Sequence, residues 1–245
     1  MWPDIVKLEL GDVEFYNYGE SGSGNQYIRN LLFVANEKYK FNKDDLVMVC
    51  WSSAFRNDWF TLNGWVTEGN AFFPGDYGSK LDTALWDLNH YTIRDASVIT
   101  GASKFLETLD SQTHQFAIIN NFSNGDQEHG YIEQEILDHP ECKPYVEYLK
   151  TQIKPSYWEM GYDLEYNNVI LNDIPLSHRD DHPLPNTTLA YLTKTFDHKF
   201  SQDTIDKVNI HNNEVWNLFC EYAKHDPGNG FYKFIETNSN FSQFS

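Results

Sequence analysis

Two segments of the sequence carry the residue types that nucleophilic catalysis uses. Ser21 lies in the glycine-rich stretch GESGSGN, residues 19–25, and the segment SHRDDHP, residues 177–183, contains Asp180 and His182. An imidazole oriented by a carboxylate is the usual general base for a serine nucleophile. The two segments therefore predict acyl-transfer chemistry, and the alternative is that the Asp-His pair belongs to an ordinary polar surface turn.

The glycine-rich stretch has a second use, because it precedes a predicted helix. Consecutive N–H groups at a helix N-terminus favour an anion or a developing oxyanion. Gly22, Gly24 and Asn25 are candidate donors to such a group, and the alternative is a tight turn in which Asn25 caps the helix. The stretch lacks the spacing of a dinucleotide fingerprint and the Lys-Ser/Thr pair of a phosphate loop.

A third segment, SSAFRND at residues 52–58, follows a short apolar run and supplies Ser53 and Arg56. An arginine at the carboxyl end of a strand is a candidate clamp for a carboxylate or a phosphate. The alternative is an ion pair between Arg56 and Asp58 or another acidic residue.

A metal site is the remaining chemical alternative. It would use His178, Asp180 and His182 as ligands, with a further donor from a distant segment such as Asp126, Glu128 or His129. No second ligand cluster stands out in the sequence, so we expect no metal and no other cofactor.

The elements that must position these segments alternate between strand and helix. Strands are expected at 13–18, 45–51, 115–122 and 167–174, a loop at 52–80, and helices at 25–40, 81–110, 131–160, 186–199 and 202–224. This order predicts one α/β domain over 1–245 with a mostly parallel sheet, ending in a flexible tail over 225–245. Loops at the carboxyl ends of parallel strands share one edge, so we expect the three segments to converge.

Composition narrows the classes of partner. The 245 residues carry a formal net charge of −18, which repels nucleic acid phosphates. No run approaches the roughly 18 apolar residues of a membrane span, and the N-terminus does not read as a secretory signal. Cys50, Cys142 and Cys220 are odd in number and widely spaced, which favours reduced thiols in a cytoplasmic protein.

Taken in order, the three segments resemble the SGNH (GDSL-like) hydrolase family and its bacteriophage variants. NYGESG at 17–22 looks like the second block of the family and DDHP at 180–183 looks like the last, while GSGN at 22–25 and CWSSAFR at 50–56 are similar to the phage proteins. The resemblance implies a flavodoxin-like three-layer α/β/α sandwich. It also implies hydrolysis of an ester, with His182 as the general base.

In that comparison Asp180 orients His182, Gly22 lies in the oxyanion hole, and the substrate is a small-molecule or carbohydrate ester. The sequence departs from the family pattern in three places. One residue separates Asp180 from His182 instead of two. The Asn of the third block is missing, so Ser53 or Arg56 would replace it. The Gly-Asp-Ser block that supplies the nucleophile would precede everything that matches here.

Two interpretations of the nucleophile follow. Either Ser21 of GES is the nucleophile, or the stretch is the second block and the chain, lacking a nucleophile, is inactive. A non-catalytic glycan-binding or virion-associated protein on the same scaffold is the alternative function. The aromatic residues between 55 and 77 would then stack on sugar rings. The expected location is the cytoplasm, or the host cytoplasm or virion for a viral protein, and the sequence does not fix the oligomeric state.

Overall fold

The computed structural model describes residues 2–20, 22–54, 56–70, 88–117, 134–156 and 184–225. Within these residues the elements, in chain order, are α1 (Trp2–Leu10), α2 (Asn25–Tyr39), β1 (Leu46–Trp51), β2 (Arg56–Thr61), β3 (Gly64–Asn70), α3 (Leu88–Leu106), β4 (Gln112–Ala117), α4 (Gln134–Leu137), α5 (Lys143–Gln152), α8 (Pro185–Phe196) and α9 (Gln202–His225). The described chain is therefore of mixed α/β class, and its helices agree with those predicted at 25–40, 186–199 and 202–224.

The chain divides into two compact units. A sheet unit comprises Tyr18–Glu159, and a helical unit comprises Met1–Asn17 with Met160–Ser245. The sequence predicts a single domain. The two units are distinguished by the contacts that residues make within each of them.

A parallel pair of strands lies at the centre of the sheet unit. β1 pairs with β4 in continuous register from Leu46 opposite Gln112 to Trp51 opposite Ala117. The predicted parallel pairing is confirmed for these two strands. The strand predicted at 115–122 begins three residues earlier than expected, at Gln112, and is described as far as Ala117.

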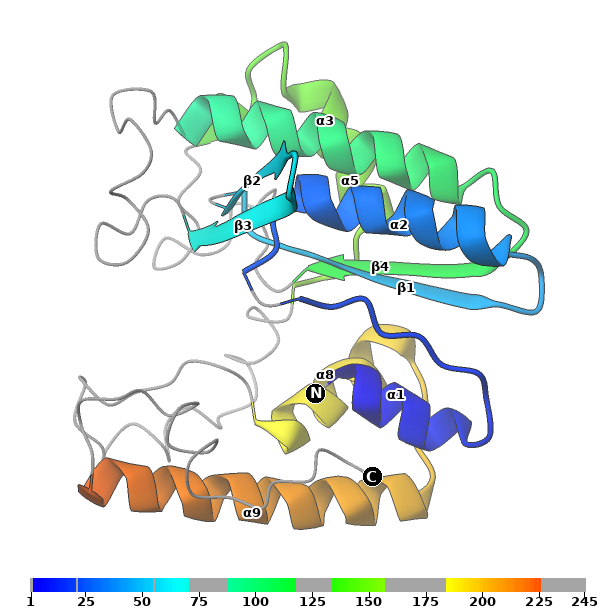
Figure 1. Cartoon of the computed structure of the whole chain (residues 1–245), viewed down its shortest axis with the longest axis vertical. Helices are drawn as coiled ribbons and strands as arrows, with labels where there is room; N and C mark the ends of the chain where they lie inside the picture. Colours follow the sequence, from blue (N-terminus) through cyan, green and yellow to red (C-terminus); the bar gives the residue numbers. More distant parts are fainter. Residues whose placement is uncertain are drawn as a thin grey trace. The chain divides into compact units, whose positions relative to one another are not determined.

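One face of this strand pair is covered by α2, α3 and α5, with α3 in contact with both neighbours (Figure 1). Val47, Val49 and Trp51 alternate along β1 and are buried in the core that these helices share. The period of two places every second β1 side chain toward the helices. Met48 and Cys50, on the other face, are only half-buried.

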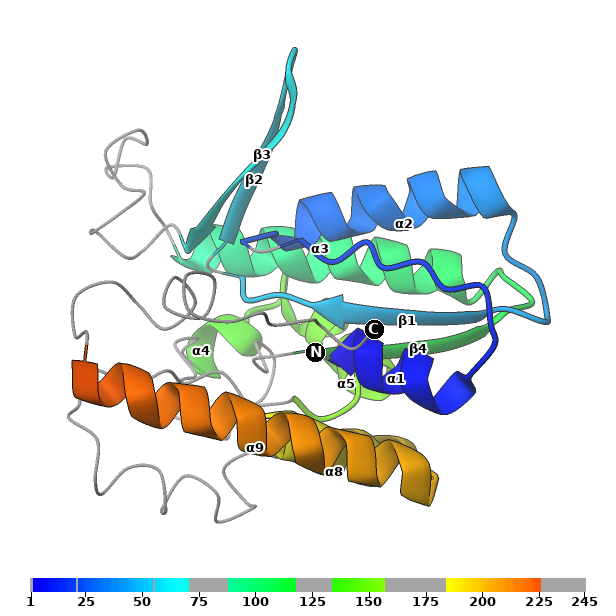
Figure 2. The ribbon, with the colours of Figure 1, turned by 60° about the horizontal axis from the view of Figure 1, so that its bottom comes forward.

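The segment predicted as a loop over 52–80 contains an antiparallel hairpin, so that prediction is wrong for residues 56–70. β2 and β3 are joined by the two-residue turn Leu62-Asn63, and Gly64 has a positive φ of 111°. A glycine with positive φ directly after the turn is a common hairpin feature, and the polar residues of β2 obscured this one. The hairpin extends away from the β1–β4 pair (Figure 2).

The prediction of a strand at 13–18 is also wrong, since these residues form no β-strand pairing within the described chain. They are mostly exposed, with Val13, Tyr16 and Tyr18 each more than a third accessible. Aromatic and β-branched residues favour a strand only where a pleated, half-buried surface is available to them. The parallel crossover therefore runs from β1 through the hairpin and α3 to β4.

The helical unit is held by packing of α1, α8 and α9 against one another. Its fully buried apolar side chains include Ile5, Tyr191, Leu192 and Val208. At the start of α9 the Ser201 hydroxyl accepts the Thr204 N–H, an N-cap, and Glu9 accepts from the Ser201 N–H and hydroxyl. This contact fixes α1 at the junction of α8 and α9.

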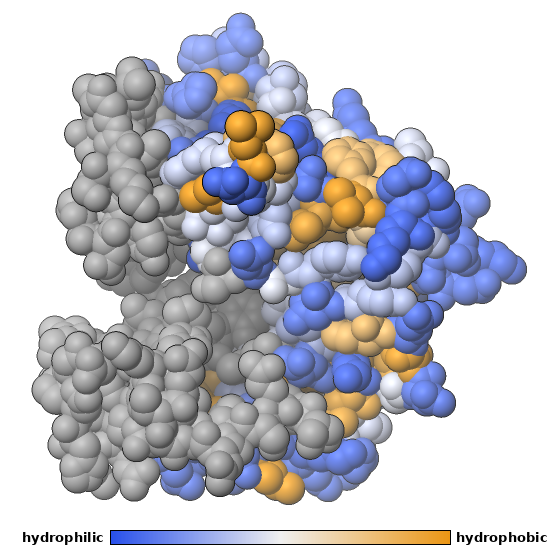
Figure 3. Space-filling model, in the orientation of Figure 1, coloured by the Kyte–Doolittle hydropathy of each residue, from blue (hydrophilic) through white to orange (hydrophobic). Residues whose placement is uncertain are grey.

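None of the described helices has the length and apolar character that a membrane crossing requires. On the face that Figure 3 presents, apolar side chains of the described residues form small groups between polar ones. Scattered apolar residues of this kind are normal for a protein surface.

Candidate functional site

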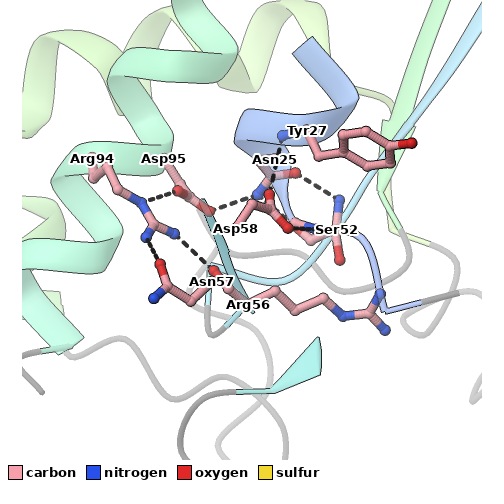
Figure 4. A network of polar contacts seen from close by, with 9 residues as sticks. Asn25, Tyr27, Ser52, Arg56, Asn57, Asp58, Arg94 and Asp95 are labelled. Carbon is pink, nitrogen blue, oxygen red and sulfur yellow. Dashed lines mark hydrogen bonds and ion pairs between the residues drawn. The ribbon is translucent and has the colours of Figure 1, made fainter. Parts of the chain in front are cut away.

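The N-terminal turn of α2 meets the carboxyl end of β1 through Asn25. Its amide nitrogen Nδ2 donates to the Ser52 carbonyl at 2.9 Å, and its Oδ1 accepts the Ser52 N–H at 2.8 Å (Figure 4). Asn25 is fully buried, so both bonds are shielded from water. Two of the three segments expected to share an edge of the sheet, 19–25 and 52–58, therefore lie side by side.

Asn25 also reaches α3. Its Nδ2 donates to Asp95 Oδ2 at 2.7 Å, and Asp95 is fully buried. Burial raises the pKa of Asp95 to about 6, although the charge and hydrogen bond of Arg94 and the bond from Asn25 act in the opposite direction. One side chain thus connects α2, β1 and α3.

Arg94 attaches the hairpin to the same helix. Its Nε donates to Asp95 Oδ1 at 2.7 Å, its Nη1 to Asn57 Oδ1 at 3.0 Å and its Nη2 to the Arg56 carbonyl at 2.8 Å. Its guanidinium also lies 4.4 Å from the centre of the Tyr91 ring. All three of its nitrogens are engaged, so Arg94 is a structural residue in this cluster.

The amides at the start of α2 are occupied by a carboxylate of the protein itself. Asp58 accepts the Gly24 N–H on Oδ1 at 2.7 Å and the Tyr27 N–H on Oδ2 at 3.0 Å. Gly24, the N-cap residue, has no side chain to serve as a cap. Asp58 therefore caps α2 from the hairpin and occupies the position where an anion would bind.

Asp58 is almost completely buried, and burial raises its pKa, opposed by the two amide bonds and by the nearby guanidinium groups of Arg94 and Arg56. The contact also explains the glycine. A Cβ on Gly24 would lie 2.5 Å from Asp58 Oδ2, closer than real Cβ atoms come to other atoms.

Arg56 extends to the other side of the cluster. Its Nη1 donates to the Ser23 carbonyl at 3.1 Å, and its backbone N–H donates to the Ser53 carbonyl at 3.2 Å. Burial lowers the pKa of Arg56, while the negative charge of Asp58 raises it. Ser23 is only 5% exposed, and among the described residues its hydroxyl has no hydrogen-bond partner.

The structure brings together five of the residues predicted from sequence. Gly22, Gly24, Asn25, Ser53 and Arg56 lie in the α2 turn and the segment that follows β1, and Gly22 has the positive φ of 82° that favours glycine. Gly24 and Asn25, predicted as donors to a ligand, use the groups just described inside the protein. Their described contacts therefore hold parts of the protein together.

The remaining predicted residues lie outside the described part of the chain. They are the catalytic candidates Ser21, Asp180 and His182, and the alternative metal ligands His178, Asp126, Glu128 and His129. Within the described ranges, no group of three or more His, Cys, Asp or Glu side chains could hold a metal ion.

Sequence reasoning missed the roles of Asp58, Arg94 and Asp95. Asp95 is spaced four and seven residues from Ile99 and Ala102, which are buried in α3. A charged residue on the apolar face of a helix needs a buried partner, so this spacing was a usable signal. Nothing local marks Asp58 as the cap of a helix that begins 33 residues earlier in the chain.

The described cluster contains two carboxylates, Asp58 and Asp95, two guanidinium groups, Arg56 and Arg94, and the hydroxyls of Ser23 and Ser53. The charges balance, which makes burial of the cluster tolerable. The two guanidinium groups are used unevenly, since Arg94 donates three hydrogen bonds to described residues and the Arg56 side chain donates one.

Comparison of the chain with protein-family models, with curated proteins and with solved structures finds no match to any of them.

Proposed function

We propose that the chain is an ester hydrolase of the SGNH-like type, built on a flavodoxin-like three-layer α/β/α sandwich. The observation that supports this proposal is the junction of the glycine-rich turn with the segment after β1, held by Asn25 and Ser52. The proposed site requires those two segments at one edge of a parallel strand pair. The sandwich also requires a helical layer on the face of β1 that carries Met48 and Cys50.

Gly24 and Asn25 hold the junction, so Gly22 is the proposed oxyanion donor of this turn. Ser53 is the proposed second donor, because it stands where the resembled family has its Asn. A single well-placed donor of this kind contributes about 3 kcal/mol to the transition state. His182 is the proposed general base and Asp180 its orienting acid, both in the segment SHRDDHP.

The proposed reaction is acyl transfer in two steps. A serine oxygen bonds to the ester carbonyl carbon and gives its proton to His182. The C–O bond to the alcohol then breaks, and the alcohol leaves with that proton. Water repeats the sequence on the acyl-enzyme and releases the acid. Ser21 is the nucleophile if GES is the first block. Otherwise the nucleophilic serine lies outside the segments that resemble the family.

Hydrolysis of p-nitrophenyl acetate tests the proposal in the wild-type protein and in His182→Ala, Ser21→Ala and His90→Ala variants. His90 is an exposed histidine of α3 and controls for unspecific hydrolysis by surface imidazoles. Loss of activity in His182→Ala alone supports a general base that serves another serine. Loss in both His182→Ala and Ser21→Ala identifies Ser21 as the nucleophile. Equal rates in all four proteins contradict the proposal.

A glycan-binding function is the second candidate, and the hairpin is the observation that favours it. The Phe60 ring is 69% exposed and stands edge-on to Trp65, with ring centres 5.6 Å apart. The Tyr27 ring also contacts Trp65, and the centres of these two rings are 5.6 Å apart. Exposed aromatic faces can stack on sugar rings. Quenching of tryptophan fluorescence by soluble polysaccharides, lost in Phe60→Ala but kept in Phe33→Ala, would support this function over hydrolysis.

A further inference from the structure

The guanidinium group of Arg56 has donors to spare. An arginine carries five N–H donors, and among the described residues this side chain uses one, from Nη1 to the Ser23 carbonyl. Arg94, in the same cluster, donates from Nε, Nη1 and Nη2. The two arginines therefore differ, since Arg94 donates from all three of its nitrogens and Arg56 donates from one.

Asp58 does not use these donors. Its two oxygens accept from the Gly24 and Tyr27 amides, so it acts on Arg56 through charge across space. Figure 4 shows the Arg56 side chain running away from Arg94 and Asp95. Its guanidinium thus lies away from the Arg94–Asp95 pair.

The Ser23 hydroxyl adds a second unused group at the same place. Ser23 supplies the carbonyl that accepts from Arg56, and its hydroxyl is buried without a hydrogen-bond partner in the described chain. A buried polar group without a partner costs roughly 1–3 kcal/mol, which a ligand that bonds to it would recover. The hydroxyl can donate to an anionic oxygen beside the guanidinium.

We infer that Arg56 and Ser23 bind a carboxylate carried by the substrate, which makes the substrate class a half-ester of a dicarboxylic acid or another ester with a free carboxylate. The ester part of this inference rests on the proposed function, whereas the carboxylate part rests on the cluster alone. The planar fork of a guanidinium matches the two oxygens of a carboxylate.

A carboxylate fits this site better than a phosphate. Asp58 and Asp95 lie in the same cluster, and the whole chain has a formal charge of −18. A group that carries two charges doubles both its repulsion from these carboxylates and its attraction to Arg56, and the net negative charge of the chain leaves the repulsion in excess. The site therefore favours an oxyanion group with one negative charge, such as each carboxylate of a dicarboxylic acid, over a doubly charged phosphate group.

Binding of succinate tests the carboxylate part without any need for turnover. Calorimetric titration is made at fixed salt with the wild type, Arg56→Gln and Arg29→Gln, where Arg29 is a half-buried arginine of α2 and controls for the loss of one positive charge. We expect Arg56→Gln to weaken succinate about 10- to 100-fold, the range of a charged hydrogen bond. Arg29→Gln stays within twofold of the wild type, and inorganic phosphate binds more weakly than succinate.

Ser23→Ala and Arg56→Lys keep the test decisive if Arg56→Gln does not fold. Removing the buried hydroxyl leaves the thermal midpoint unchanged or higher, and it weakens succinate about three- to tenfold. Arg56→Lys keeps the charge and loses the fork, so it also weakens succinate. Succinate affinity that is equal in all folded variants, or absent in the wild type, overturns the inference.

Turnover separates this inference from the proposed function. Monomethyl succinate and its neutral isostere methyl succinamate are compared in the wild type and in Arg56→Gln. The wild type prefers the anionic ester, and Arg56→Gln loses that preference through KM. If neither ester is hydrolysed although succinate binds through Arg56, the hydrolase proposal fails and the anion site stands. If both are hydrolysed equally in both proteins, the anion site fails and the hydrolase stands.

Discussion

Gly24 is the residue at which the site has the least tolerance. The Asp58 carboxylate lies where a Cβ would be, so any side chain at this position must displace the cap of α2. The glycine is required by this close approach, since its own backbone conformation, φ −96°, is open to any residue.

We therefore expect Gly24→Ala to lower the free energy of unfolding by about 1–3 kcal/mol, the cost of a lost cap together with local strain. Urea denaturation measures this change. Gly101→Ala is the matched control, because Gly101 lies within α3 and a Cβ there meets nothing within 4 Å. The control should gain about 0.5–1 kcal/mol from helix propensity. If Gly24→Ala and Gly101→Ala change the free energy of unfolding by the same amount, the contact between Gly24 and the Asp58 cap is absent.

We expect a substitution of Asp58 to lower the free energy of unfolding less than Gly24→Ala does. Asp58→Asn keeps the size of the side chain and removes the charge that favours the α2 N-terminus. We expect a loss of about 0.5–2 kcal/mol in stability, the range for a weakened cap, measured by the same denaturation. Asp44→Asn, at an exposed position, controls for the change in net charge and should leave stability within about 0.5 kcal/mol.

At the scale of elements, the hairpin depends on one arginine. Arg94 connects α3 to the first residues of β2 through the Asn57 side chain and the Arg56 carbonyl. An isolated two-stranded hairpin is only marginally stable in water, so these anchors and the α2–β2 contact hold it.

Arg94→Lys keeps the charge beside Asp95 but cannot serve three acceptors from one ammonium group. We expect amide hydrogen exchange in 56–70 to become about 10- to 100-fold faster, because the hairpin opens locally. Exchange in α5 should not change, and Arg29→Lys is the control. Uniform acceleration across β1, β4 and α5 would instead mean that Arg94 stabilises the whole unit.

At the scale of the whole molecule, two carboxylates respond to pH in opposite directions. Burial raises the pKa of Asp95 to about 6, so its contribution to stability is full below its unfolded value near 3.8 and is lost as pH rises through 6. The pKa of Glu9 shifts in the opposite direction. Burial raises this pKa, but hydrogen bonds from Thr204, Ser201 and His198 outweigh burial and lower the pKa to about 2. Its contribution is present above about 4.5 and is lost as pH falls through 2.

We expect the free energy of unfolding to rise as pH falls from 7 to about 4.5 and to decline below that. The rising limb reflects protonation of Asp95, whose shift corresponds to about 3 kcal/mol in full, of which about 2 kcal/mol falls between pH 7 and 4.5. Asp95→Asn should flatten the limb above pH 4.5, and Glu9→Gln should flatten the limb below it. Denaturant titrations from pH 2.5 to 8 measure both limbs. A profile that rises with pH between 4.5 and 7 in the wild type contradicts the assignment for Asp95.

The sequence by itself determined the elements whose signals are local. The apolar run at 46–51 and the helical spacing of α2, α8 and α9 are written in consecutive residues, and the parallel pairing of β1 with β4 follows from strands separated by a helix. It also placed Asn25, Ser53 and Arg56 together, although the strand at 13–18 on which the expectation for Asn25 rested does not form.

Only the tertiary structure decided what those residues do. Whether the amides at the start of α2 are open or occupied depends on Asp58, which reaches them from a hairpin more than 30 residues away. Whether Asn25 caps its helix or connects three elements depends on Ser52 and Asp95. Hydrogen bonds and burial join residues that are distant in the chain, so no local pattern encodes which donors are used and which, as at Arg56, are not used by the described residues.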